Sequence, residues 1–198
     1  MNHPLKLIVG LGNPGPQYVN TRHNAGEDFV EFLARSFNAE LKPDTKYFGR
    51  VGNCLIGTQN VRLLIPETFM NRSGKAIAAL AGFYKILPEN ILVAYDELDL
   101  DPGIAKLKFG GGHGGHNGVR DSISCLANTR DFYRLRIGIG HPGAANLVTN
   151  YVLSKPSPDD SLAIEGAIRA AIDVMPLACK GDWNDAMKNL HTKQQETD

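Results

Sequence analysis

The sequence has no excess of either charge, few cysteines and no long apolar run. Its 198 residues include 21 basic and 21 acidic side chains, so no field of the whole molecule would draw it to nucleic acid or to a membrane. The three cysteines, Cys54, Cys125 and Cys179, lack the paired spacing of a zinc site or a disulfide framework. No segment resembles a secretory signal or a membrane span, so we expect a cytoplasmic protein.

The best-known hydrolase signatures are missing as well. The chain contains no GxSxG elbow, no HExxH helix and no CxxC pair, which excludes the commonest serine and zinc hydrolases. The segment "SGKA" at 73–76 resembles a phosphate-binding loop, but Phe69 replaces the leading glycine and Ala76 replaces the hydroxyl residue. The sequence therefore predicts no metal and no nucleotide-phosphate loop of this kind.

What the chain does have is the composition of one α/β domain. It is 42% hydrophobic, which is enough for one substantial core. Apolar runs and helical periodicity alternate, predicting a three-layer sandwich with a twisted mixed, mostly parallel sheet flanked by helices. We expect a domain over 1–190 and a flexible polar tail over 191–198. The expected strands are 5–10, 47–57, 61–65, 91–95, 104–109 and 133–140. Helices are expected to begin near 21–23, to span 73–85 and 119–126, and to occur twice in the C-terminal third. The turn between the second and third strands is expected at Gln59-Asn60.

The motif "GLGNPG" imitates a dinucleotide-binding turn. Gly10, Gly12 and Gly15 have the GxGxxG spacing directly after a predicted strand. Pro14 and Pro16, however, remove N–H donors that would bind a pyrophosphate, and no acidic residue ends a second strand about 20 residues later. A tight turn that positions side chains is the favoured interpretation.

His23 and Asp96 are the candidate catalytic pair. His23 begins a predicted helix, where the helix dipole disfavours protonation and keeps the imidazole available as a base. Asp96 follows the strand 91–95, at a strand end where open α/β sheets collect functional groups, and could orient the imidazole. Taken alone, His23 could simply cap its helix, and Asp96 could belong to a solvated acidic turn.

Three asparagines follow predicted strands or stand in loops: Asn13, Asn71 and Asn117. Amides can hold a peptide backbone, position water or donate to an oxyanion, but each asparagine alone is more simply a turn residue. Asn117 belongs to "GGGHGGHNG", which could be an anion-binding nest or a mobile loop. His113 and His116 in that loop lack cysteine or carboxylate neighbours and are weak metal ligands.

Basic side chains alternate on two predicted strands. Lys106 and Lys108 share one strand face, and Arg134 and Arg136 share another. Two such pairs could clamp a phosphate, although a solvated strand face is the usual explanation of alternating charge.

Taken together, six motifs resemble the bacterial peptidyl-tRNA hydrolase family. In order along the chain, from residue 10 to residue 143, they are "GLGNPGPQY", "TRHNAG", "FMNRSGKA", "DELDLDPG", "GGGHGGHNG" and "RLRIGIGHPG". The resemblance implies a monomeric α/β enzyme without metal or cofactor. Its expected reaction is hydrolysis of the ester between a peptide, or an N-blocked aminoacyl group, and the 3′ ribose of tRNA, which recycles tRNA released early from ribosomes.

The resemblance also implies roles for single residues. His23 matches the family's catalytic base and Asp96 its partner. The substrate-binding positions fall on Asn13, Tyr18, Met70, Asn71, His116 and Asn117. Lys108 and Arg136 match a basic clamp for the tRNA 5′ phosphate, which makes the tRNA acceptor end the expected partner of a local basic patch. The chain departs from some relatives at Tyr95, where they have a histidine.

Two other classes of function remain to be separated from this one. A non-catalytic RNA-binding relative would keep the fold and the basic surface but would not need His23 and Asp96. A nucleotide-dependent oxidoreductase, suggested by "GLGNPG", would bind a nicotinamide cofactor. Because no nucleophile adjoins His23 by motif, direct attack by water is the expected mechanism.

Overall fold

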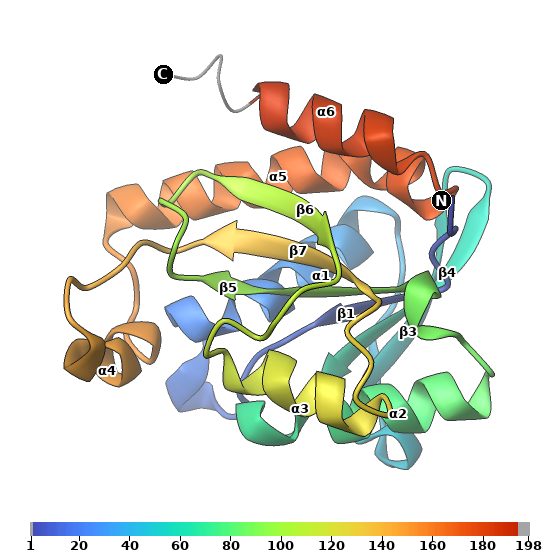
Figure 1. The fold of residues 1–198 in the computed structure, drawn as a ribbon, viewed down its shortest axis with the longest axis horizontal. Helices are drawn as coiled ribbons and strands as arrows, with labels where there is room; N and C mark the ends of the chain where they lie inside the picture. Colours follow the sequence, from blue (N-terminus) through green and yellow to red (C-terminus); the bar gives the residue numbers. More distant parts are fainter. Residues whose placement is uncertain (1, 194–198) are drawn as a thin grey trace.

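A seven-stranded mixed sheet forms the centre of the computed structural model, which describes residues 2–193 (Figure 1). The strands follow the order β2-β3-β4-β1-β5-β7-β6. The four strands β4, β1, β5 and β7 are parallel, and the antiparallel pairs lie toward the two edges. The predicted α/β sandwich is confirmed. The strand bounds are β1 Leu7–Gly10, β2 Lys42–Asp44, β3 Gly49–Ile56, β4 Gln59–Pro66, β5 Ile91–Glu97, β6 Ala105–Phe109 and β7 Tyr133–Gly138.

Helices cover both faces of the sheet, as Figure 1 shows. Helices α1 and α5 pack on one face, with α6 against α5 and β6, while α2 and α3 lie on the other. A short helix, α4, lies beyond the carboxyl ends of the parallel strands. The helix bounds are α1 Ala25–Ser36, α2 Ser73–Phe83, α3 Asn117–Cys125, α4 Val148–Val152, α5 Pro158–Cys179 and α6 Trp183–Lys193.

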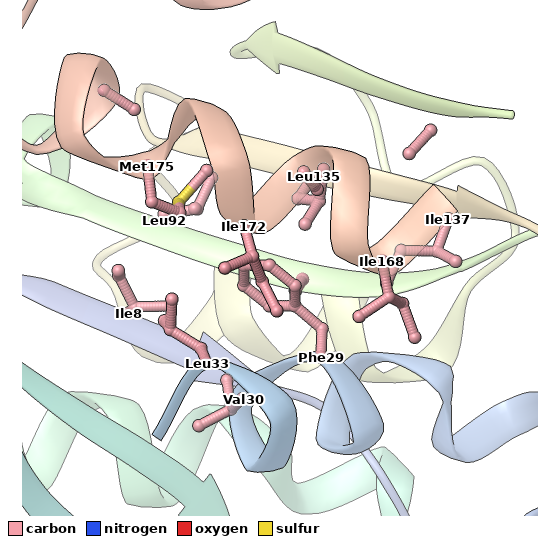
Figure 2. Packing of buried hydrophobic residues seen from close by; sticks show 14 of the residues in the cluster. Ile8, Phe29, Val30, Leu33, Leu92, Leu135, Ile137, Ile168, Ile172 and Met175 are labelled. Atoms are coloured by element: carbon pink, nitrogen blue, oxygen red, sulfur yellow. The ribbon is translucent and has the colours of Figure 1, made fainter. Parts of the chain in front are cut away.

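The larger core lies between the sheet and the layer of α1 and α5 (Figure 2). Phe29 and Leu33 of α1 and Ile168 of α5 are 0–1% exposed and meet Ile8 and Leu92 of the sheet. The four-residue spacing of Phe29 and Leu33 places both on one side of α1. This apolar packing fixes α1 against the parallel strands.

Two glycines allow α1 to approach the sheet closely. A Cβ atom on Gly26 would lie 2.1 Å from the carbonyl oxygen of Ala94 in β5, and one on Gly10 would lie 2.2 Å from the carbonyl oxygen of Gly26. The glycine at position 10 of "GLGNPG" therefore serves helix–strand contact. As a result, the turn η2 (Arg22–Asn24), just before α1, lies at the carboxyl ends of β1 and β5.

Three features differ from the sequence predictions. The β3–β4 turn is at Gly57-Thr58, where Gly57 has a left-handed φ of 60°, whereas Gln59 and Asn60 already pair within β4. The strand β2 and the helix α4 were not predicted, because three and five residues are too short to show a period. Helix α6 includes residues 191–193 of the expected tail, and 194–198 lie outside the described residues.

In the described part of the chain, no helix has the length and apolar character needed to cross a membrane.

Candidate active site

A cavity of about 430 Å³ opens at the carboxyl ends of the parallel strands. Segments far apart in the sequence line it: the loops after β1 and β4, the end of β5, the glycine-rich loop and α4. Such an edge is where open α/β sheets bind ligands. Among the sequence candidates, the cavity is lined by His23, Asp96, Asn13, Met70, Asn71, His116 and Asn117.

The buried carboxylate of Asp96 joins two histidines. His23 Nδ1 lies 2.8 Å from Asp96 Oδ2, and His116 Nε2 lies 2.7 Å from Asp96 Oδ1. The contact predicted between His23 and Asp96 is therefore present. That Asp96 also binds His116 was not predicted, because nothing in a glycine-rich loop shows which strand end its side chains reach.

The hydrogen bonds determine which ring nitrogens carry protons. His116 precedes α3, and its Nδ1 accepts from the backbone N–H groups of Gly118 and Val119 at 3.2 and 3.3 Å. Its Nε2 must then donate to Asp96. The carboxylate also accepts from His23 Nδ1, so a neutral His23 has a lone pair on Nε2. No described residue forms a hydrogen bond with that nitrogen.

The charges of the cluster oppose the prediction made from the helix dipole. Burial lowers the pKa of His23, but the charge of Asp96 and its hydrogen bond together raise this pKa above 6.5. The carboxylate of Asp96 therefore opposes the helix dipole and favours the protonated imidazole. Burial alone would raise the pKa of Asp96, yet His23 and His116 hold this pKa well below its ordinary value.

The same three side chains were tested as a metal site. Their potential ligand atoms all lie within 4.8 Å of one another. Around a tetrahedral zinc ion with bonds of about 2.0–2.1 Å, however, ligand atoms lie about 3.3 Å apart. The nitrogen–oxygen distances of 2.7 and 2.8 Å fit hydrogen bonds instead. A metal would have to displace both protons and separate the side chains.

Asn13 is held rigidly at the base of the cavity. Its Oδ1 accepts from the backbone N–H of Met70 at 2.7 Å, which turns its Nδ2 group into the remaining donor. Asn24 binds both backbone groups of Asn13, accepting from N–H at 2.9 Å and donating to C=O at 3.0 Å. Asn24 is 3% exposed. Sequence reasoning missed its role, since a residue that binds backbone leaves no spacing signal.

The other predicted substrate positions differ in where they lie. Asn71 and Asn117 line the cavity and are exposed, and Asn117 Oδ1 accepts from Arg120 at 2.8 Å. The three asparagines therefore converge on one site. Tyr18 lies in the turn η1 (Pro16–Tyr18) and is not part of the cavity lining. Its carbonyl oxygen instead accepts from Thr21.

The buried side chain of Arg134 holds the glycine-rich loop in place through hydrogen bonds to its backbone. This side chain is 1% exposed, and its guanidinium donates to the carbonyl oxygens of Gly111 and Gly112. Arg134 therefore lies neither on a solvated strand face nor where it could bind a phosphate, the two alternatives left open for the basic pairs. Within the loop, His113 Nδ1 accepts from Gly115 N–H at 3.0 Å, and Gly111, Gly114 and Gly115 have positive φ. Only glycine adopts these conformations readily.

Lys108 and Arg136 lie on the sheet face of α2 and α3, outside the cavity lining. In the antiparallel register Arg136 is opposite Lys106, and Lys108 is opposite the buried Arg134. Lys108 and Arg136 are therefore diagonal neighbours, about 7 Å apart at their backbones. Lys108 is exposed, whereas Arg136 donates to Glu97 at 3.0 Å.

Helix α4 supplies a wall of the cavity that the sequence did not reveal. Val148, Thr149, Val152 and Leu153 line the opening. Arg22, next to His23, anchors this segment: its guanidinium donates to the Ser154 side chain at 2.6 Å and to nearby carbonyls, and it lies 3.9 Å from the Tyr151 ring centroid. On another side, the Tyr95 ring packs against His116, with ring centroids 5.0 Å apart.

A second cavity, of about 500 Å³, lies beside α1 and α5. Its polar lining includes Glu27, Glu31 and Arg50, which bind one another: Arg50 Nη2 is 2.9 Å from Glu27, and Arg50 Nη1 also pairs with Glu31. These three charges pair with one another, whereas the cavity at the strand ends holds a histidine with an unpaired Nε2 beside a buried carboxylate, so that cavity is the candidate active site.

The fold and the site together define a class of protein. A histidine bonded to a buried carboxylate, facing an amide-lined cavity at the strand ends of an α/β sandwich, is an arrangement found in hydrolases. The profile of the peptidyl-tRNA hydrolase family matches residues 7–198, and the chain belongs to that family.

Individual relatives agree with this assignment. The chain is 59% identical over 189 residues to peptidyl-tRNA hydrolase of Saccharophagus degradans, covering 96% of each protein. It is 60% identical over 187 residues to the Mannheimia succiniciproducens enzyme, covering 94% of this chain and 96% of the relative. The crystal structure of peptidyl-tRNA hydrolase from Acinetobacter baumannii superposes with a TM-score of 0.91 at 48% identity, covering 94% of each chain.

Proposed function

We propose that the chain hydrolyses the ester between a peptide, or an N-blocked aminoacyl group, and the 3′ ribose of tRNA, with His23 as the base that activates water. Membership of the family supplies the substrate class. The observation that carries the mechanism is the pairing of His23 Nδ1 with Asp96, which leaves Nε2 available in the cavity. The imidazole can then accept a proton from water while Asp96 stabilises the cation that forms.

The amides complete the proposed mechanism. The Nδ2 group of Asn13 is free to donate to the carbonyl oxygen as negative charge develops, and loss of one such donor typically costs about 3 kcal/mol of barrier. Asn71 and Asn117 bind the peptide backbone and water from the cavity rim. The ribose oxygen leaves when the tetrahedral intermediate collapses. His116 holds Asp96 from its second side.

Hydrolysis of an N-blocked aminoacyl-tRNA by wild type and His23→Ala tests the function. We expect kcat to fall at least about 100-fold, because general-base catalysis contributes that much or more. Binding of tRNA should remain, so a non-catalytic RNA-binding protein would be recognised by binding without hydrolysis in the wild type. A nucleotide-dependent oxidoreductase would bind a nicotinamide cofactor saturably. We expect no saturable binding when the protein is titrated with such a cofactor.

The route of attack has its own test. The described lining of the cavity contains no serine, cysteine or lysine, and no hydrogen bond among the described residues joins its one threonine, Thr149, to His23. We therefore propose direct attack by water without a covalent intermediate. In a single turnover in ¹⁸O-water, the label should enter the peptide carboxylate. Trapping of an acyl-enzyme would contradict this route.

We propose further that Lys108 and Arg136 bind the tRNA 5′ phosphate, and that the enzyme acts as a cytoplasmic monomer. Lys108→Gln should weaken binding of tRNA and reduce the slope of log affinity against log salt by about 0.7–0.9, as expected when one phosphate contact is lost. A minimal ester substrate without tRNA phosphates is the control. If Lys108→Gln lost as much activity on that substrate, the phosphate clamp would be contradicted. The monomeric state has a separate test, which is light scattering on the purified protein.

A further inference from the structure

A cluster of aromatic rings lies at the C-terminal end of α2, away from the active site. Tyr47, Phe83 and Tyr84 contact one another, with centroids 4.8 Å apart for Phe83 and Tyr84, and 5.9 and 6.0 Å from Tyr47 to these two. Tyr47 is buried, but Phe83 is 55% exposed and Tyr84 is 37% exposed. Two of the three rings therefore present faces or edges to solvent.

Two cations lie over these exposed rings. The ammonium of Lys46 is 3.4 Å from the centroid of Phe83, and the guanidinium of Arg62 is 3.4 Å from the centroid of Tyr84. We call Lys46, Tyr47, Arg62, Phe83 and Tyr84 the α2 patch. A cation this close to a ring gains from the ring quadrupole and keeps its charge.

Neither cation of the α2 patch pairs with a carboxylate among the described residues. Asp44 caps the backbone N–H of Lys46, not its ammonium, and Arg62 donates to the amide of Asn53 at 3.0 Å. On the opposite helical layer, Arg169 also approaches a ring, that of Phe32, but it pairs with Glu165 at 2.6 Å. The two cations of the α2 patch thus have no ion-pair partner among the described residues, on a chain with no net charge.

A cavity of about 540 Å³ continues the patch past Arg62 and Tyr84. Three amides line it, and they can donate and accept like the edges of nucleobases. Lys6 adds a second cation, and the lining includes no carboxylate. The amides are those of Asn53, Gln59 and Asn60.

The patch and the cavity are separate from the candidate active site. Helix α2 begins next to the turn that holds Met70 and Asn71, and its 11 residues span about 16 Å before Phe83. The cavity lies at the amino ends of β1 and β4, whereas the active site lies at the carboxyl ends. Lys108, on β6, is four strands away from Arg62, about 19 Å across the sheet.

We propose that the α2 patch and its adjoining cavity bind unpaired nucleotides of RNA. Bases would stack on Phe83, Tyr84 and the guanidinium of Arg62, while Lys46 and Lys6 contact phosphates. Exposed aromatic rings beside cations are the usual platform for single-stranded nucleic acid, and amides can contact base edges. We favour RNA over an acidic protein because the amides of the cavity lie beside its cations, so that base edges and phosphates could be contacted together.

Equilibrium binding of a fluorescein-labelled octauridylate, which lacks any aminoacyl end, tests the proposal without relying on hydrolysis. Fluorescence anisotropy over a salt series would compare the wild type with Phe83→Leu, Tyr84→Leu and Arg62→Gln. The leucine variants keep apolar volume, and Phe83 is exposed enough to change without unfolding; thermal melts check each variant. Arg169→Gln is the matched control, because it also removes a cation over a ring. Lys108→Gln reports on the proposed clamp.

We expect salt-dependent binding that weakens about ten-fold or more in Phe83→Leu or Tyr84→Leu, consistent with the stacking of one base. Arg62→Gln should weaken binding, because the guanidinium on which a base stacks is lost, while Arg169→Gln binds as the wild type does. The absence of binding, or loss only in Lys108→Gln, would overturn the proposal. The proposal would also be overturned if both leucine variants bound octauridylate as the wild type does and polyglutamate competed equally well for the protein. That result would assign the patch to an acidic protein.

Discussion

At the residue scale, the imidazole of His23 must lose its proton before it can act as a base. Because Asp96 raises the pKa of His23 above 6.5 in spite of burial, the base form becomes populated only above that pH. We predict that kcat/KM increases with pH along a limb whose midpoint lies above 6.5. A pH series on an N-blocked aminoacyl-tRNA measures this midpoint. A limb centred below 6.5 would show that burial outweighs the carboxylate of Asp96.

Asp96→Asn separates the two influences on His23. Without the carboxylate, burial is left as the main effect and lowers the pKa of His23, so the midpoint should move below that of the wild type. The maximal rate should nevertheless fall by about 100-fold or more, because the imidazolium is no longer stabilised and the tautomer is no longer fixed. A fall in rate with an unchanged midpoint would mean that Asp96 only orients the ring.

The residues that face the cavity from strand ends and from a helix start were predictable from the sequence. His23, Asp96 and Asn13 stand directly after strands or at a helix start, and parallel strands bring those positions to one edge. Asn24 and Arg134 were not predictable, because they act by binding backbone groups of distant loops. Which backbone lies within reach of a buried side chain depends on the finished fold.

At the scale of elements, the contact of α1 with the strands depends on Gly26. We predict that Gly26→Ala destabilises the protein by about 1–3 kcal/mol or more, because its Cβ would lie 2.1 Å from a backbone oxygen that cannot move aside. Gly166→Ala is the matched control within α5, where nothing lies within 4 Å of the added atom. It should stabilise by about 0.5–1 kcal/mol. Thermal unfolding measures the change in Tm of both variants. Equal changes in Tm would contradict the argument that α1 approaches the sheet closely at Gly26.

Elements were predictable in proportion to their length. The helix at 73–85 and the strand at 91–95 were found within two residues of α2 and β5, since the helix has several turns of apolar residues and the strand is a continuous apolar run. Helix α4 has five residues and no such pattern, although it forms one wall of the cavity. The β3–β4 turn was misplaced because Gln59-Asn60 looked like a turn, while Gly57 supplied the left-handed residue.

At the scale of the whole molecule, alternation of strands and helices was enough to predict the layers but not the order of the strands. The site needs β1 between β4 and β5, because only that order brings the loops carrying Asn13, Met70 and Asp96 together. The order follows from long-range crossovers between parallel strands, and these leave no local pattern. The structure brings residues of five of the six motifs into one cavity, and the sixth, "RLRIGIGHPG", contributes none of its described lining.

Because the molecule has no net charge, the titration of a single buried carboxyl group, that of Asp28, should affect how the free energy of unfolding depends on pH. Burial, with Glu27 and Glu31 nearby, raises the pKa of Asp28 to about 7 from 3.8. The folded state then binds more protons than the unfolded state between these values, so the free energy of unfolding falls as pH rises through them. Because the chain has equal numbers of acidic and basic side chains, overall repulsion should not mask this trend near neutrality.

Asp28→Asn should therefore increase the free energy of unfolding at pH 8 by about 1–3 kcal/mol, since one pKa unit corresponds to about 1.4 kcal/mol. At pH 4, where the carboxyl of the folded wild type is already protonated, the two proteins should be equally stable. Asp159→Asn, an exposed acid in the first turn of α5, is the control and should give no gain at pH 8, because it only weakens a favourable contact with the helix dipole. Urea unfolding at both pH values measures the difference. If Asp28→Asn is the less stable protein at pH 8, the carboxylate is stabilised by α1 more than burial and its acidic neighbours oppose it.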